Sequence, residues 1–147
     1  MDLDKLDHLY GDSILDHCRN PRNHIKIKQP TLSAKAVNPF CGDEANVQID
    51  MENGRISRVG VQGVGCAINQ ATTSMLSETI KGKTLRAVQD TEGLFRKMMS
   101  GSEMSTMDLE YLGDLKALIT VREYPIRIKC ALLGWSAIEE AIGNTGR

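Results

Sequence analysis

The 147-residue sequence lacks an excess of positive charge, because 18 lysines and arginines face 19 aspartates and glutamates. It therefore has little with which to neutralise nucleic-acid phosphates over a wide surface. It also lacks any apolar run near the roughly 20 residues that span a bilayer. Its first residues contain neither the basic nor the apolar region of a secretion signal. We expect no nucleic-acid partner, no membrane partner and a cytoplasmic location.

Cysteines number only four. In a chain without an export signal, cytosolic thiol buffers oppose structural disulfides. Metal binding, catalysis and simple burial are the interpretations that remain. With 41% hydrophobic and 25% charged residues, the composition is that of a globular protein, and the length fits a single domain over residues 1–147.

The first half of the chain predicts one helix followed by a small sheet. Apolar side chains recur every three or four residues over 3–18, the period of an amphipathic helix. The polar, proline-containing stretch 22–33 is typical of an extended connection. Alternating residues on both sides of Asn53-Gly54 predict a hairpin. The predicted antiparallel strands cover residues 34–37, 47–51 and 56–61.

The second half predicts helices. Pro125 suits the first turn of the last helix, and Gly143 suits its end. The polar stretch 100–107 predicts a surface loop. We expect an α+β fold in which the three-stranded antiparallel sheet packs against a layer of helices, with a metal site at one end. The predicted helices cover residues 66–81, 85–99, 109–121 and 125–143.

Cys41, Asp43 and Cys66 occupy positions that favour chemistry. Cys41 and Asp43 lie two residues apart in a loop shaped by Pro39 and Gly42, so both side chains can approach one ion. Cys66 opens a helix, where free backbone N–H groups and the helix dipole favour a thiolate. These three residues are candidate metal ligands, and the two cysteines are candidate nucleophiles.

Cys130 lies early in the last predicted helix, beside Arg127 and Lys129, whose charges should lower the pKa of its thiol. Three thiolates and one carboxylate would close a tetrahedral zinc shell. The separations of 25 and 64 residues between the three cysteines match no CxxC knuckle. From spacing alone, a shared metal site and scattered buried cysteines are both open interpretations.

Other residues with metal-binding or adaptable side chains have simpler interpretations. Cys18 falls on the apolar face of the first predicted helix, which favours burial. His17 points about 100° away from it on a helix, so the two cannot easily share an ion, and a surface or structural role is favoured. The methionines at 98, 99, 104 and 107 fill a core or form a docking face, with core filling favoured.

Three ordered motifs give the chain a family resemblance. They are similar to those of the U-type iron–sulfur assembly proteins, the SufU and IscU family, and the similarity runs through nearly the whole chain. The long stretch between Cys66 and Cys130 resembles the insertion of SufU-type members. Lys129 stands where the IscU branch has a histidine. The motifs are Cys41-Gly42-Asp43, Gly63-x-Gly65-Cys66-Ala67 and Arg127-x-Lys129-Cys130-Ala131.

The resemblance implies a zinc-dependent sulfurtransferase of iron–sulfur cluster biogenesis. Its zinc ligands would be Cys41, Asp43, Cys66 and Cys130. Cys41 would accept persulfide sulfur from a SufS-type, pyridoxal-phosphate-dependent cysteine desulfurase, once a histidine of that enzyme replaces it on the zinc. Arg127 would position the exchanged groups. Downstream iron–sulfur assembly proteins would be further partners.

Two alternatives use the same four residues. The chain could be a scaffold that assembles a transient [2Fe–2S] cluster and passes it to acceptor proteins. It could also be an adaptor in which a closed, structural zinc only maintains a partner-binding surface.

Overall fold

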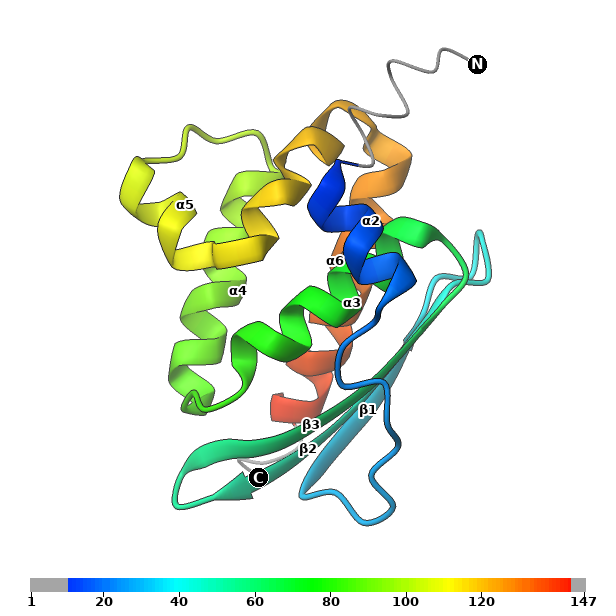
Figure 1. Cartoon of the computed structure of the whole chain (residues 1–147), viewed down its shortest axis with the longest axis vertical. Coiled ribbons are helices and arrows are strands. Elements are labelled where there is room, and N and C mark those ends of the chain that lie inside the picture. The colour runs from blue at the N-terminus through cyan, green and yellow to red at the C-terminus, as the bar shows by residue number, and fades with distance from the viewer. Residues whose placement is uncertain (1–10, 144–147) are drawn as a thin grey trace.

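The computed structural model describes residues 11–143 as a three-stranded sheet with helices on one of its faces (Figure 1). This arrangement confirms the α+β class. None of the helices in the described range is long and apolar enough to cross a membrane. In chain order the elements are α2 (Asp12–Arg19), β1 (Leu32–Val37), β2 (Glu44–Glu52), β3 (Arg55–Val64), α3 (Ala67–Ile80), α4 (Leu85–Met99), α5 (Thr106–Leu112), the 3₁₀ helix η1 (Gly113–Glu123) and α6 (Pro125–Gly143).

The sheet has the strand order β1-β2-β3, and both strand pairs are antiparallel. Asn53 and Gly54 both have positive φ, as the predicted tight hairpin requires. Val47 and Ile49 face the core from β2 and are fully buried. Asn46, which lies between Ala45 and Val47 in the same strand, is only partly buried. The predicted strands are therefore confirmed, although each one is longer than its apolar core suggested.

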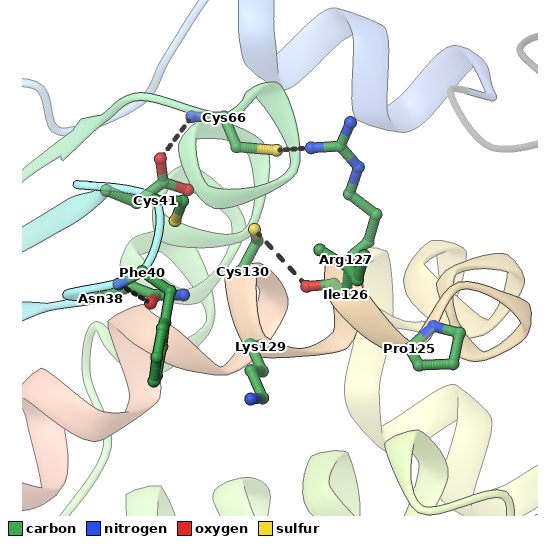
Figure 2. A pocket seen from close by; sticks show the side chains of 10 residues that line it. Asn38, Phe40, Cys41, Cys66, Pro125, Ile126, Arg127, Lys129 and Cys130 are labelled. Carbon is green, nitrogen blue, oxygen red and sulfur yellow. Dashed lines mark hydrogen bonds between the residues drawn. The ribbon is translucent and has the colours of Figure 1, made fainter.

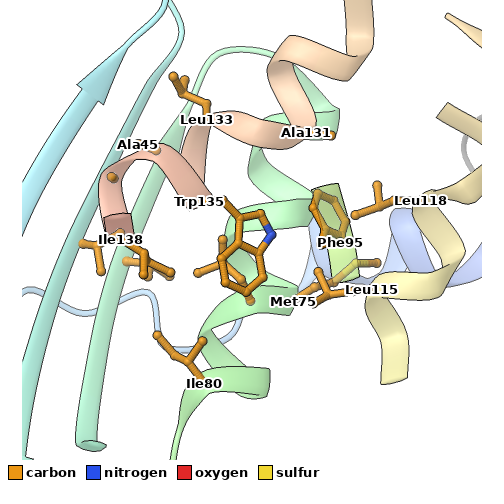
Figure 3. Packing of buried hydrophobic residues seen from close by; sticks show 14 of the residues in the cluster. Ala45, Met75, Ile80, Phe95, Leu115, Leu118, Ala131, Leu133, Trp135 and Ile138 are labelled. Atoms are coloured by element: carbon orange, nitrogen blue, oxygen red, sulfur yellow. The ribbon is translucent and has the colours of Figure 1, made fainter. Parts of the chain in front are cut away.

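Helices α3 and α6 lie against the inner face of the sheet, with α4 and η1 behind them (Figure 1). The core joins Trp135 of α6 to Phe95 of α4, whose ring centroids are 5.8 Å apart (Figure 3). Both rings are fully buried, and aromatic pairs at this separation add to the hydrophobic stabilisation. This contact fixes α6 relative to α4, and further contacts of α6 with β1 and β2 place it against the sheet.

The helix expected over 109–121 is wrong as a single element. The Ser105 side chain accepts a hydrogen bond from the Asp108 N–H, which caps α5 and begins it at Thr106. Gly113 then takes a positive φ of 57° and ends α5, and the chain continues as η1. The polar surface loop is consequently shorter than the predicted 100–107.

The other predicted helices agree with the described part of the chain, but the core role favoured for the four methionines is wrong for Met107. Helix α2 matches the second half of the helix predicted over 3–18, whose first residues lie outside the described range. Met98 and Met99 are buried in the core, as favoured, whereas Met107 on α5 is 80% exposed. The β1–β2 loop and the first residues of α3 and α6 meet at one end of the sheet.

Candidate metal centre

The loop between β1 and β2 is a hydrogen-bonded turn. Asn38 organises it: its N–H donates to the Asp43 carbonyl at 2.9 Å, its carbonyl accepts from the Gly42 N–H at 2.8 Å, and its side-chain oxygen accepts from the Phe40 N–H at 3.0 Å. Gly42 has a φ of 76°, which glycine adopts without strain. The turn presents Cys41 to solvent and buries the Asp43 carboxylate.

Three of the four predicted ligands form a compact group. One ligand atom from each of Cys41, Asp43 and Cys130 lies within 4.8 Å of the other two. Asp43 Oδ1 accepts a hydrogen bond from the Cys66 N–H at 3.1 Å, but its buried Oδ2 has no hydrogen-bond partner among residues 11–143. A buried carboxylate oxygen without a partner is costly, and a cation would satisfy it. Two thiols and this carboxylate are a donor set that suits zinc.

Cys66 adjoins the group but faces another residue. It is the N-cap of α3, as predicted for a cysteine that opens a helix, and it belongs to the same pocket. Its sulfur accepts a hydrogen bond from Arg127 Nη1 at 3.0 Å (Figure 2). Cys66 is not among the three residues whose donor atoms converge. Its place as the fourth ligand stays a prediction.

The pKa of Cys130 differs from the sequence expectation. Its pKa is raised to about 12, chiefly by burial and to a smaller extent by the nearby Cys66 and Asp43. The two cations that were expected to lower it point elsewhere: the Arg127 guanidinium donates to Cys66, and the Lys129 ammonium lies over an aromatic ring of the Cys41 loop. The predicted lowering is therefore wrong. Deprotonation of this thiol needs a cation in contact with it, and binding of a metal ion would release the proton.

The group lies in an open pocket of about 620 Å³ whose walls come from the Cys41 loop and the starts of α3 and α6 (Figure 2). Phe40, Pro125 and Ile126 give this pocket an apolar rim. The sequence did not place these residues at the site, because exposure of an apolar side chain leaves no local pattern.

Gly65 and Asn69 shape the site from behind. Gly65 has a φ of 104°, and a Cβ at this position would overlap the Asp43 carboxylate. Its place in the Gly63-x-Gly65-Cys66 motif was the signal in the sequence. The buried Asn69 Nδ2 donates to the carbonyls of Glu44 at 2.8 Å and Val64 at 3.1 Å, and so fastens α3 to the ends of β2 and β3. No local pattern in the sequence indicates this role of Asn69.

Cys18 lies outside the converging group. It is partly buried against the core, and its thiol donates to the Ala67 carbonyl at 3.2 Å. Burial raises the pKa of Cys18, and the neighbouring Cys66 adds to this effect. These observations agree with the packing role favoured for it.

His17 has a structural position. Its ring is 2% exposed, with Nδ1 2.8 Å from Ser74 Oγ and Nε2 3.2 Å from Asp114 Oδ2. It thereby joins α2 to α3 and η1, which is the structural role that was expected. His24 is exposed, and His8 lies outside the described residues.

Comparison with known proteins identifies the family. Residues 9–145 match the NifU-like N terminal domain. The chain belongs to this family. Among NifU-like relatives, the zinc-dependent sulfurtransferase SufU of Bacillus subtilis is 36% identical over 139 residues, which cover 95% of this chain and 92% of the relative. The iron-sulfur cluster assembly scaffold protein IscU of Streptococcus pyogenes is 32% identical, with coverage of 97% and 87%.

The NifU-like fold is shared with solved structures too. The SufU crystal structure from Fervidobacterium islandicum superposes with a TM-score of 0.84 at 32% identity and covers 92% of this chain and 98% of that one. A NifU-like N-terminal protein from Brucella abortus gives a TM-score of 0.82 at 21% identity, which shows the fold alone. The expected family is thereby confirmed. The SufU-like nature of the segment between Cys66 and Cys130 stays a prediction.

Proposed function

We propose that this protein is a zinc-dependent sulfur acceptor that takes persulfide sulfur from a SufS-type cysteine desulfurase for iron–sulfur cluster biogenesis in the cytoplasm. Cys41 is the acceptor, and the protein serves the desulfurase as co-substrate and activator. The observation that carries the proposal is the contrast within the group: Cys41 is exposed, whereas Asp43 and Cys130 beside it are buried. Kinship with the SufU of Bacillus subtilis supports it.

The zinc ligands in this proposal are Cys41, Asp43, Cys66 and Cys130. Bound zinc would keep its cysteine ligands as thiolates at neutral pH. Asp43 brings a negative charge into a buried position where Oδ2 has no partner among residues 11–143. In this proposal, Cys66 turns its side chain from Arg127 toward the group and completes the set.

Cys41 performs the transfer because its sulfur is the one that a second protein can reach. Its thiolate attacks the terminal sulfur of the desulfurase persulfide, a new S–S bond forms on Cys41, and the S–S bond in the desulfurase breaks. The desulfurase cysteine leaves as a thiolate with the electron pair of the broken bond. One sulfur atom moves, and the step needs no external oxidant or reductant.

Arg127 acts as a positioning residue. Its Nη1 donates to the Cys66 sulfur at 3.0 Å, and when Cys66 turns to the zinc the donor fork of Arg127 positions the groups exchanged with Cys41. Downstream iron–sulfur assembly proteins then receive the sulfur from Cys41.

Reconstitution with a SufS-type desulfurase tests the proposal. Wild-type protein is expected to accelerate cysteine turnover, and Cys41→Ala is expected to abolish the acceleration while the fold, checked by circular dichroism, is retained. Cys18→Ser is the matched control, because Cys18 is outside the group and should leave the acceleration intact. If Cys41→Ala stimulates as well as wild type, the acceptor role is wrong.

A scaffold that assembles a [2Fe–2S] cluster is the second candidate, favoured by the names of the IscU relatives from Streptococcus pyogenes and Thermotoga maritima. Against it, Lys129, in the position before Cys130, directs its ammonium over Phe40 and offers no ligand to the group. Metal analysis of protein purified without oxygen separates the two. Zinc without sulfide supports the acceptor, and iron with equimolar sulfide supports the scaffold.

A further inference from the structure

Phe40 displays its ring beside the candidate sulfur acceptor. It directly precedes Cys41, and its side chain is 89% exposed. The turn that carries it is closed by hydrogen bonds from the Phe40 and Gly42 N–H groups to Asn38, which fix the Phe40 backbone beside Cys41. A large aromatic side chain that is held outside by a rigid turn is preorganised for contact with another molecule.

Ile126 provides a second exposed apolar side chain across the pocket. It lies in the first turn of α6 and is 80% exposed. Both Phe40 and Ile126 line the pocket that holds Cys41, and Figure 2 shows them on either side of the Cys130 sulfur. Phe40 belongs to the loop between β1 and β2, and Ile126 belongs to α6.

Lys129 adds one positive charge to the same rim. Its Nζ lies 5.5 Å from the centroid of the Phe40 ring, within the range of a cation–π contact. Among residues 11–143, no carboxylate forms an ion pair with Lys129. A carboxylate on a partner can therefore meet this ammonium without displacing an ion pair within the described chain.

The position of the rim limits what can reach Cys41. The Cys41 sulfur shares its group with two buried donors, inside a pocket bordered by Phe40 and Ile126. A persulfide carried on a protein that reaches Cys41 through this pocket passes Phe40 and Ile126, which brings the surface of the donor protein against them. This step rests on the proposed function, since it takes the sulfur donor to be a protein.

We propose that Phe40, Ile126 and Lys129 form the docking surface for the protein that donates sulfur. The complementary surface has an apolar hollow that receives the Phe40 ring and a carboxylate within reach of Lys129. Exposed aromatic side chains at the centre of an interface commonly contribute a large part of the affinity, while a rim charge contributes salt-dependent association.

Direct binding to a SufS-type cysteine desulfurase tests this surface independently of turnover. With zinc-loaded protein in biolayer interferometry, Phe40→Ala is expected to raise the dissociation constant about tenfold or more, and Ile126→Ala about fivefold. Phe40→Tyr keeps the ring and should bind like wild type. Lys129→Gln should weaken binding at low salt and lose part of the salt dependence.

Met107→Ala is the matched control, because Met107 is as exposed as Ile126 but lies on α5, away from the pocket. Its binding should equal that of wild type, and all variants should keep the wild-type zinc content. The proposal is overturned if wild type does not bind, if Phe40→Ala and Ile126→Ala both bind within twofold of wild type, or if Met107→Ala weakens binding as much as Phe40→Ala. The two proposals fail separately: if wild type binds the desulfurase but does not accelerate it, the acceptor role is wrong, whereas if wild type accelerates it but Phe40→Ala and Ile126→Ala bind like wild type, the docking surface is wrong.

Discussion

The carboxylate of Asp43 accepts a hydrogen bond from the backbone N–H of Cys66, with 3.1 Å between Oδ1 and N. This bond links the Cys41 loop to the start of α3 and fixes the orientation of the carboxylate. Its other oxygen, Oδ2, is buried without a hydrogen-bond partner among residues 11–143, and the carboxylate contributes one oxygen to the group formed with Cys41 and Cys130. One carboxylate thus has a structural oxygen and a candidate ligand oxygen.

Asp43→Asn separates these two roles. The amide oxygen can still accept from the Cys66 N–H, but the NH₂ group in place of Oδ2 can neither ligate nor carry charge. We expect the fold to persist and zinc affinity to fall at least about tenfold in a chelator competition. Asp50→Asn is the control, because Asp50 pairs with Arg58 on the sheet. Equal affinity of Asp43→Asn and wild type would remove Asp43 from the ligand set.

Cys66→Ser tests the fourth ligand. If Cys66 turns from Arg127 toward the metal, cobalt-loaded wild type has three thiolate ligands, and the variant loses about one third of the thiolate-to-cobalt charge-transfer absorbance. Cys18→Ser should leave the spectrum unchanged. A spectrum of Cys66→Ser that matches wild type would mean that the Cys66 sulfur remains with Arg127.

Gly65→Ala and Gly93→Ala should have opposite effects on stability. At Gly65 the backbone has positive φ and a Cβ would overlap the Asp43 carboxylate, so we expect a loss of about 2 kcal/mol or more in the free energy of unfolding. At Gly93, inside α4, a Cβ would meet nothing within 4 Å, so alanine should stabilise by about 0.5–1 kcal/mol. Urea unfolding of metal-free protein measures both. If Gly65→Ala leaves the free energy of unfolding unchanged, the close approach of the Gly65 backbone to the Asp43 carboxylate is contradicted.

Glu92→Gln tests the pH dependence of stability. Burial raises the pKa of Glu92, and this effect outweighs the hydrogen bond that Arg96 Nε donates to its Oε2 at 2.7 Å. Because the folded protein favours the protonated carboxyl, the stability that Glu92 contributes is complete below its unfolded pKa and is lost as pH rises through the folded pKa.

The glutamine variant mimics the protonated form, so its stability relative to wild type should increase between about pH 4 and about pH 7. Urea midpoints of metal-free protein at several pH values measure this gap. Glu103→Gln, at an exposed position that is not among the groups acting on Glu92, is the control and should show a smaller change. A gap that is constant with pH, or that narrows toward pH 7, would contradict the raised pKa.

Much of the fold follows from local sequence patterns. The hairpin at Asn53-Gly54 and the helix that begins at Pro125 were both predicted, because each depends on backbone preferences within a few residues. The prediction of a single helix over 109–121 was wrong because Gly113 ends α5 with a positive φ. An isolated glycine is also tolerated inside a helix, so the sequence pattern does not show whether it continues or ends the helix.

The sequence by itself determined which side chains could carry the chemistry. Cys41, Asp43 and Cys130 were identified from residue type and motif, and the structure brings their donor atoms within 4.8 Å of one another. Only the tertiary structure decided where Arg127 and Lys129 point, and hence that the pKa of Cys130 is raised. The reason is physical: backbone periodicity depends on near neighbours in sequence, whereas burial and charge contacts depend on elements that meet only after the chain has folded.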